Sequence, residues 1–355
     1  MKLKSIKFEN FRCFKKRKQE FHDRLTILTS CPGNRGATTI LEGIKIAIAP
    51  FISGLLGDKS LLDLNIISPN DLSQFPNMPK KFTTKIKTKG LWPEKILHSP
   101  KTFSWELKAF SQELKINTHD ENTITLYKAG KILKENFNKE IQNIEGKSRD
   151  LPLITYLSDF YLPKKSKKLL PLEGKRIAGY YDCLSLSSDF FIHFEKYWEK
   201  LLCLYWEKLV RNEPLPPCAE NINVIKKAID SVIKELTGWG NLSFSIAKNR
   251  QITLFHSKYG GMPLSMIESE VQDTVAKIID IAFRCILLNP HYGGNVLTET
   301  RGVVLIDNFD SGLHPSLVAP ILTSFCNTFP KIQFIVVIKS MYDAQSANGG
   351  DYFIN

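Results

Sequence analysis

Residues 31–39 form the stretch that decides the fold, and they read Cys31-Pro32-Gly33-Asn34-Arg35-Gly36-Ala37-Thr38-Thr39. Just before them, Leu25-Thr26-Ile27-Leu28 is a short apolar run typical of a buried β-strand. Just after them, residues 38–48 carry apolar side chains at helical spacing. A strand, a glycine-rich loop and a helix, in this order, are the parts of a phosphate-binding P-loop. The stretch therefore predicts a P-loop-like α/β core.

The loop lacks two groups of a working P-loop, whose pattern is G-x-x-x-x-G-K-[ST]. Cys31 stands where the first glycine is expected, and Ala37 stands where a lysine would reach the β- and γ-phosphates. Thr38 keeps the hydroxyl that would hold Mg²⁺. The sequence therefore predicts the backbone elements of a nucleotide site without the lysine that would carry its positive charge. On this motif alone, an ordinary loop with two glycines would read the same way.

Further segments follow patterns that occur together in one family. They are Leu3-Lys4-Ser5-Ile6-Lys7-Phe8-Glu9-Asn10-Phe11-Arg12-Cys13-Phe14, Arg176 to Leu184, Pro263-Leu264-Ser265 leading into Phe283-Arg284 and Leu287-Leu288-Asn289-Pro290, Gly302-Val303-Val304-Leu305-Ile306-Asp307-Asn308-Phe309-Asp310 followed by Leu313-His314-Pro315, and Ile332 to Ser340. Together with the loop they resemble the SMC/RecF-like branch of the ABC ATPases, in particular the ATPases of bacterial anti-phage defence operons of the retron and Septu types. The resemblance spans nearly the whole chain.

The resemblance implies an α/β fold with an ABC ATPase-like (P-loop NTPase) core that is split in sequence. Residues 1–65 would form the N-terminal part of this core. Residues 66–240 would form an α+β insert with strands, basic segments and two aromatic-rich helices, expected at 189–211 and 222–237. Residues 241–355 would complete the core with the signature, Walker B, D-loop and switch segments. The aromatic stripe of the first helix is typical of a core or of a surface for a partner helix.

The catalytic elements depart from the family pattern. Where the family has Asp followed by Glu in Walker B, this chain has Asp307 and Asn308, and an amide cannot accept a proton from the attacking water. Lys339 stands at the position of the switch histidine. Asp310 and His314 occupy the D-loop, which the resemblance assigns to a dimer interface.

The signature loop, usually L-S-x-G-[EQ], corresponds to Ile267-Glu268-Ser269-Glu270-Val271, so glutamates replace its serine and glycine. In an ABC dimer the helix that follows directs its free N–H groups at the partner's γ-phosphate. Ser265 to Glu268 has the S-x-x-E form of a capping box, which would satisfy these groups internally. Glu268 and Glu270 would also repel a triphosphate. We therefore expect a self-capped helix without a ligand.

These substitutions predict a pseudo-ATPase without catalytic residues. The degenerate nucleotide site would consist of Gly33, Asn34, Arg35, Gly36, Ala37, Thr38, Thr39, Asp307, Asn308 and Lys339. No cofactor or metal is expected. The alternative is a slow, rewired ATPase that binds ATP with Mg²⁺ on Thr38 and Asp307. In that enzyme Arg35 or Lys339 would supply the missing charge, and Asp310 would activate water.

The net charge of +12 and the isoelectric point near 9.2 come from unevenly placed lysines. They form three clusters: residues 15–18, residues 80–89, and the run of Lys164, Lys165, Lys167 and Lys168. Any one of them could be an ordinary solvated surface, but three favour contact with the phosphates of DNA or RNA. No aromatic platform for single strands and no helix-turn-helix accompanies them, so base recognition is not supported.

The remaining composition fits a cytoplasmic protein. The charged start Met1-Lys2-Leu3-Lys4 is unlike a signal peptide, and no long uncharged apolar run predicts a membrane span. The seven cysteines are scattered without metal-ligand spacing.

By analogy with the family, we expect a scaffold or regulator of an anti-phage complex. Its partners would be a second copy or an ATPase-like chain, an effector nuclease or another protein of the defence operon, and DNA or RNA, with no membrane. A DNA-binding clamp in repair is a further alternative.

Overall fold

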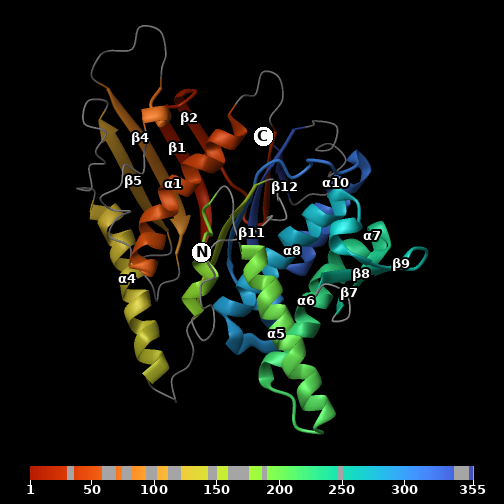
Figure 1. Ribbon diagram of the computed structural model, residues 1–355. Coiled ribbons are helices and arrows are strands. Elements are labelled where there is room, and N and C mark those ends of the chain that lie inside the picture. The colour runs from red at the N-terminus through yellow and green to blue at the C-terminus, as the bar shows by residue number, and fades with distance from the viewer. Residues whose placement is uncertain are drawn as a thin grey trace.

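The computed structural model describes residues 1–29, 36–57, 69–73, 82–92, 102–110, 121–142, 150–158, 176–185, 190–245, 251–339 and 352–354. The described strands form three sheets of four, five and three strands. Figure 1 shows the five-stranded sheet between helix α1 on one side and helices α8 and α10 on the other.

The four-stranded sheet is antiparallel and has the order β2-β1-β4-β5. Its strands are β1 (Lys2–Phe11), β2 (Phe14–Glu20), β4 (Thr83–Leu91) and β5 (Phe103–Phe110). Alternate residues such as Phe8, Ile86 and Leu107 are buried on one face. On that face the indole nitrogen of Trp105 donates a hydrogen bond to the carbonyl of Ala47 in α1, at 2.8 Å. One face of the sheet therefore belongs to the core.

Helix α1 (Ala37–Leu56) packs closely on helix α4 (Glu121–Gln142) through glycines. A Cβ at Gly54 would lie 2.1 Å from the carbonyl oxygen of Tyr127, and a Cβ at Gly130 would lie 2.3 Å from that of Phe51. By length and composition α1 could cross a membrane, yet 78% of its apolar window is buried inside the protein. Its hydropathy is explained by its place in the core.

The five-stranded sheet is parallel throughout and has the order β12-β3-β11-β10-β6. Its strands are β3 (Leu25–Thr29), β6 (Leu153–Leu157), β10 (Gly302–Ile306), β11 (Ile332–Ile338) and β12 (Tyr352–Ile354). Every residue of β3, β6, β10 and β11 is buried, as expected for a parallel sheet covered on both faces. The predicted α/β class is confirmed, because strands from both ends of the chain meet in one sheet.

The segment expected as an insert contributes to both of these sheets. β4 and β5 extend the sheet that begins with β1, and β6 forms the edge of the parallel sheet beside β10. Strands on the two sides of the expected boundary at residues 65/66 therefore pair with each other, and so do strands on the two sides of the boundary at 240/241. The boundaries themselves stay predictions.

The other elements form a helical layer with a small antiparallel sheet. They are α5 (Phe190–Val210), α6 (Glu220–Ile229), a π-helical turn (Asp230–Lys234), α7 (Glu235–Thr237), β7 (Trp239–Ser245), β8 (Gln251–His256), β9 (Gly260–Pro263), α8 (Ser269–Leu288), α9 (Val296–Glu299) and α10 (Pro315–Thr328). Short 3-10 turns cover Pro69–Asp71, Arg176–Tyr180, Pro217–Ala219, Leu264–Met266 and Pro290–Asn295. The two helices expected near residues 189–211 and 222–237 are both present.

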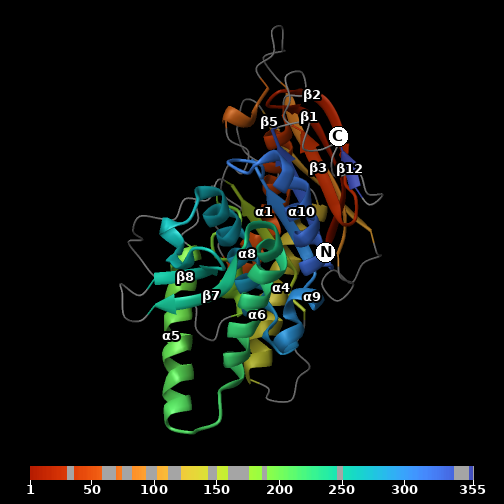
Figure 2. The same cartoon turned by 90° about the vertical axis from the view of Figure 1, so that its right-hand side faces the viewer.

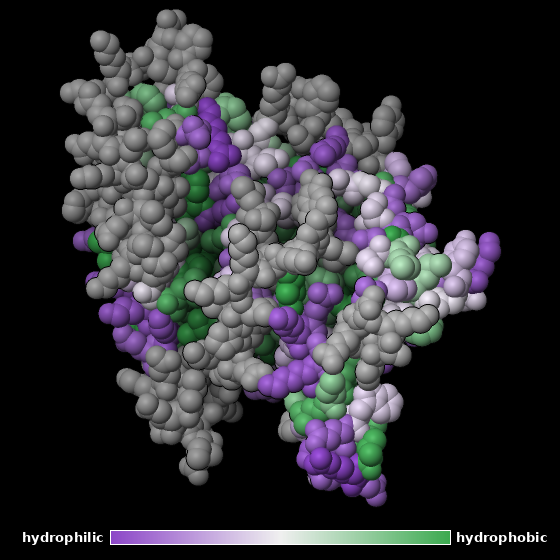
Figure 3. Space-filling model, viewed as in Figure 1, coloured by the Kyte–Doolittle hydropathy of each residue, from purple (hydrophilic) through white to green (hydrophobic). Residues whose placement is uncertain are grey.

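The first and second halves of α5 differ in exposure. Phe190, Phe194 and Trp198 are buried in the core, as the aromatic stripe predicted. The second half projects from the body of the molecule in Figure 2, and Val210 near its end is 84% exposed. Figure 3 shows hydrophobic and hydrophilic residues mixed at this tip.

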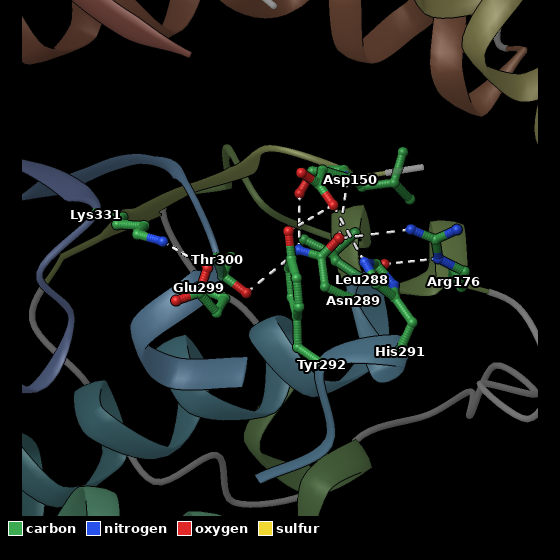
Figure 4. A network of polar contacts seen from close by, with 10 residues as sticks. Asp150, Arg176, Leu288, Asn289, His291, Tyr292, Glu299, Thr300 and Lys331 are labelled. Carbon is green, nitrogen blue, oxygen red and sulfur yellow. Dashed lines mark hydrogen bonds and ion pairs between the residues drawn. The ribbon is translucent and has the colours of Figure 1, made fainter. Parts of the chain in front are cut away.

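Two segments that carried the family resemblance meet in a buried polar network at the end of α8. Asn289 is fully buried; its amide accepts from the N–H of Leu151 at 2.8 Å and donates to the carbonyl of Leu151 at 2.9 Å. Arg176 donates to the carbonyl of Leu288 at 2.7 Å (Figure 4). Because these bonds tie α8 to the start of β6, we assign the segments a structural role.

Candidate functional site

The degenerate loop lies where β3 ends and α1 begins. Thr29 at the end of β3 pairs with Ile338 of β11, and Ile306 at the end of β10 pairs with Val336 of β11. The ends of three parallel strands therefore meet near the start of α1, which is where ligands bind in open α/β sheets. Residues 30–35, with the predicted Gly33, Asn34 and Arg35, lie outside the described residues.

Gly36 and Ala37 begin α1 in contact with the core. Gly36 has φ +113° and ψ 8°, a conformation that favours glycine. A Cβ at this position would lie 2.5 Å from the ring of Phe14. Ala37 is only 5% exposed and belongs to the hydrophobic core. The glycine is therefore required for packing, and the residue at the expected lysine position faces apolar neighbours.

Asp307 is the centre of the described site and accepts three hydrogen bonds from its own chain. The hydroxyl of Thr38 and the N–H of Asn308 donate to Oδ1 at 3.0 and 3.1 Å, and the hydroxyl of Tyr156 donates to Oδ2 at 3.2 Å. Burial raises the pKa of Asp307, although these three bonds oppose the shift. The two groups predicted for Mg²⁺, Thr38 and Asp307, are thus brought together and bonded to each other.

A second carboxylate, Glu42, lies one turn further along α1. It pairs with Lys45 at 3.0 Å, and Arg12 lies 4.0 Å away. Lys45 also lies over the ring of Tyr156, 4.1 Å from its centroid. Burial, together with the charges of Asp307 and Glu42, raises the pKa of Tyr156 well above its ordinary value. Of the cations near the site that the structure describes, Lys45 and Arg12 therefore interact with protein groups.

Sequence reasoning missed Tyr156, Glu42 and Lys45. The two charged residues follow Thr38 at intervals of four and seven residues, which places all three on one face of a helix. Charges at this spacing on an otherwise apolar helix are a signal that could have revealed them. Tyr156 gave no such signal, because it lies within an apolar strand.

The segment after β10 is tied to the end of β11. Phe309 donates its N–H to the carbonyl of Val337 at 2.9 Å, and the side chain of Asp310 accepts from the N–H of Lys339 at 2.8 Å. Lys339 itself is exposed. Asn308 has φ +49°, in the left-handed region, which asparagine tolerates better than glutamate does. The backbone here suits the amide that replaces the family's general base.

His314 directly precedes α10 and accepts a hydrogen bond from the N–H of Ser316 at 3.3 Å, so it acts as a helix cap. Between Asp310 and His314, Gly312 has φ +80°. A Cβ at Gly312 would lie 3.3 Å from Cγ of Glu270, which places the D-loop beside the start of α8. The dimer role of Asp310 and His314 stays a prediction.

The predicted capping box at the signature is wrong. Ser265 lies in a 3-10 turn (Leu264–Met266), and α8 begins only at Ser269. Glu268 is the residue before the helix, but its side chain makes no cap hydrogen bond. The cause is the buried pair Leu264 and Ile267, which anchors the turn and moves the helix start beyond the S-x-x-E pattern. The first N–H groups of α8 are therefore not capped by these side chains, while Glu270 places a carboxylate in the first turn.

The candidate nucleic-acid residues fall in two groups. Lys164, Lys165, Lys167 and Lys168 lie outside the described residues, as do Lys80 and Lys81. The cluster at residues 15–18 lies in β2, and Lys85, Lys87 and Lys89 lie in β4 of the same antiparallel sheet. The structure thus brings two of the three predicted clusters onto one sheet.

Comparison with known proteins finds partial relatives. No family model matches the chain. Over 135 residues the chain is 31% identical to a protein of Vibrio cholerae serotype O1 biovar El Tor described as the retron Vc95 probable ATPase. The aligned stretch makes up 38% of this chain and 23% of that protein. Over 122 residues the chain is 37% identical to the retron Ec83 probable ATPase of Escherichia coli, which covers 34% of this chain and 21% of that protein. The chain therefore matches less than a quarter of the length of either relative, and the predicted resemblance is confirmed over those segments.

Solved structures similar to the chain include three SMC head domains. The head domain from Thermotoga maritima has a TM-score of 0.47 at 10% identity and covers 98% of this chain and 93% of its own. An Smc head bound to the C-winged helix domain of ScpA has a TM-score of 0.48 at 11% identity, covering 98% and 92%. An Smc head with an extended coiled coil, bound to the C-terminal domain of ScpA derived from Pyrococcus furiosus, has a TM-score of 0.49 at 12% identity with the same coverage, 98% and 92%.

Proposed function

We propose that this chain is a catalytically degenerate ATPase-like protein that acts as a scaffold or regulator in a bacterial anti-phage defence complex of the retron or Septu type. It works in the cytoplasm, where it holds an effector nuclease, a nucleic acid, or both. It assembles with a second copy or with an ATPase-like partner chain. The defence context rests on the partial similarity to two retron probable ATPases.

One observation carries the loss of catalysis: Ala37, at the position of the phosphate-binding lysine, is 5% exposed and belongs to the hydrophobic core. The hydrogen bonds that Asp307 accepts from Thr38, Tyr156 and the N–H of Asn308 hold the site together without a ligand, while the oxygen of Thr38 keeps lone pairs that could ligate Mg²⁺. The remaining groups fit a bound nucleotide poorly. Ala37 offers no ammonium for the β- and γ-phosphates, and Asn308 offers no base for the attacking water.

The nearby charges support the same conclusion. Among the described residues, Lys45 lies over Tyr156 and Arg12 lies beside Glu42, and Arg12 also pairs with Asp71 at 2.6 Å. Since each is paired with a carboxylate, moving either one toward a phosphate would leave a partly buried carboxylate behind. Breaking one side of a buried ion pair costs about 3–5 kcal/mol, and somewhat less at partly exposed pairs.

The first test is calorimetric titration of the whole chain with ATP and Mg²⁺ up to millimolar concentration, with Asp307→Asn as the matched variant. We expect neither protein to release binding heat. Micromolar binding that Asp307→Asn abolishes would refute the pseudo-ATPase proposal. Co-expression with the neighbouring operon genes, followed by size-exclusion chromatography, tests the scaffold role; assembly should be the same with and without ATP.

A slow, rewired ATPase is the second candidate, and the hydrogen bond from the backbone N–H of Lys339 to the Asp310 carboxylate, which brings the two residues together, favours it over other enzymes. Lys339 is exposed at the end of β11, and its own N–H is bonded to the Asp310 carboxylate. Turnover that is lost in Lys339→Ala but retained in a control such as Lys331→Ala would support this enzyme.

A further inference from the structure

The strand registers place lysines in a lattice on one face of the four-stranded sheet. Directly opposed residues share a face, so each cross-strand row has a common orientation. Three successive rows of outward-facing residues are Lys16-Glu9-Lys85-Lys108, Lys18-Lys7-Lys87-Glu106 and Glu20-Ser5-Lys89-Ser104. We call these twelve residues the lysine face. It holds seven lysines against three glutamates, and it draws on four strands from two distant parts of the sequence.

The lysine face lies on the side of the sheet opposite the core. The residues between its members, such as Ile6, Phe8 and Ile86, are buried on the side where α1 packs (Figure 1). Members of the lysine face, including Lys7, Lys18 and Lys87, are exposed or half-exposed. The sheet therefore presents a broad, charged surface to its surroundings.

The glutamates neutralise only part of the charge. Glu9 pairs with Lys85 at 3.4 Å, Glu106 lies 3.3 Å from Lys108 and 4.0 Å from Lys87, and Glu20 pairs with Lys18. Across the ranges that the structure describes, no carboxylate lies within ion-pair distance of the remaining exposed lysines. These are Lys7, Lys16 and Lys89.

This arrangement opposes folding. Lys7 has Lys18 directly opposite on one side and Lys87 on the other, and Lys85 has Lys108 opposite. Like charges directly opposite one another destabilise a sheet. Lysine on an edge strand is a common protection against aggregation, and this would explain the lysines of β2, which is an edge strand. It does not explain Lys7 and Lys87, because β1 and β4 are interior strands.

The chemistry of the lysine face points to a phosphate backbone. Its outward positions are all lysine, glutamate or serine, so it offers no aromatic ring on which a base could stack. Its lysines repeat at about 4.8 Å between strands and about 6.8 Å along a strand. A duplex presents one negative charge per about 1.7 Å of its axis, dense enough to meet several of these lysines at once.

We propose that the lysine face is a docking surface for a nucleic-acid duplex, which it binds through the sugar-phosphate backbone without reading sequence. This inference deepens the scaffold proposal by naming the nucleic acid's form and its place. It stands apart from the nucleotide site, so titration with ATP and titration with nucleic acid give independent results.

The test is fluorescence anisotropy of the whole chain with a labelled 20-base-pair DNA duplex, over 50 to 200 mM salt. The variant carries Lys7→Gln, Lys16→Gln and Lys89→Gln. The control carries Lys128→Gln, Lys196→Gln and Lys227→Gln, which are exposed on helices and change the net charge equally. Three phosphate contacts give a slope of about −2.7 in log affinity against log salt, or about a 40-fold loss of affinity over this range. The variant should lose this contribution, and the control should keep it.

Three results would overturn the proposal: equal salt slopes for the variant and the control, tighter binding of the matching single strand than of the duplex, or no duplex binding at 50 mM salt. Binding of polyglutamate in place of the duplex, lost in the variant, would assign the face to an acidic protein and would also overturn it. Thermal unfolding provides an independent readout. Because the variant removes like-charge neighbours, its melting temperature should equal or exceed that of the unmodified chain.

Discussion

Tyr156→Phe tests most directly whether the hydrogen bonds of Asp307 serve the stability of the fold, because it removes one oxygen and leaves the ring in place. Tyr156 is buried, and its hydroxyl donates to Oδ2 of Asp307 at 3.2 Å. Without it, the carboxylate of Asp307 keeps two donors, Thr38 and the N–H of Asn308. A hydrogen bond to a charged group contributes about 1.5–3 kcal/mol to folding. For 355 residues, an unfolding entropy of about 2.1 cal/mol/K per residue converts this loss into a melting temperature lower by about 2–4 °C.

The loss should depend on pH with a defined sign. Burial raises the pKa of Asp307 in the folded chain. The carboxyl of Asp307 therefore stays protonated to a higher pH in the folded chain than in the unfolded chain. The charged form therefore destabilises the fold as pH rises from the ordinary aspartate pKa of about 3.9 through the raised value. Tyr156→Phe worsens the environment of that charged form. The difference between the variant and the unmodified chain should be largest at pH 7 and smaller near pH 4.

Differential scanning calorimetry at pH 7, 5.5 and 4 measures this difference, and ATP titration of the same samples measures any effect on binding. If these hydrogen bonds serve only the fold, Tyr156→Phe should change the melting temperature and leave ATP binding unchanged. A stability difference that stays constant across the three pH values would refute the assignment of this bond to a charged Asp307. A change in ATP affinity would refute the structural role of Tyr156.

Three further predictions concern packing and buried polar groups. Asp307→Asn removes the titrating carboxyl, so the melting temperature of this variant relative to the unmodified chain should rise between pH 4 and pH 7; a flat difference in pH-dependent calorimetry would contradict this. Gly36→Ala should lower the melting temperature by about 3–7 °C, from about 1–2 kcal/mol of backbone strain at φ +113° and about 1–3 kcal/mol of overlap with Phe14; adding Phe14→Leu should recover only the overlap. Asn289→Leu leaves the N–H and carbonyl of Leu151 without their partners and should cost about 2–5 kcal/mol in urea unfolding, whereas a loss below 1 kcal/mol would argue against the network in Figure 4.

The parallel sheet was predictable from sequence because buried parallel strands are continuous apolar runs. β3, β10 and β11 are such runs, and each is fully buried. The start of α8 was not predictable. The S-x-x-E pattern beginning at Ser265 is a local signal, but the burial of Leu264 and Ile267 overrides it. Helix capping there is decided by tertiary packing, which a four-residue motif does not contain.

The candidate site was half predictable for a related reason. Thr38 and Asp307 belong to two motifs of the family that the sequence resembles, so the resemblance assigned them to one site, and the structure joins them by a hydrogen bond. Tyr156 joins them from a strand about 150 positions before Asp307 in the chain, through sheet order. The lysine face also depends on the order of the strands in a sheet. Which strand lies beside β1 is decided by the fold, so the sequence showed the lysine clusters at residues 15–18 and 80–89 but not that they lie on one sheet.

The two sites differ in how their charges are balanced, and this difference indicates where function lies. At Asp307 the groups that an ATPase would offer to a ligand are hydrogen-bonded to one another, and these bonds offset part of the cost of burying the carboxylate. On the lysine face, Lys7 stands between Lys18 and Lys87, and among the described residues it has no carboxylate within ion-pair distance. Glu20 beside Lys18 and Glu106 beside Lys87 offset only part of the repulsion. A charge that destabilises the protein alone is compensated when a polyanion binds. The two features together favour a protein that has lost the need for ATP and has kept a surface for nucleic acid.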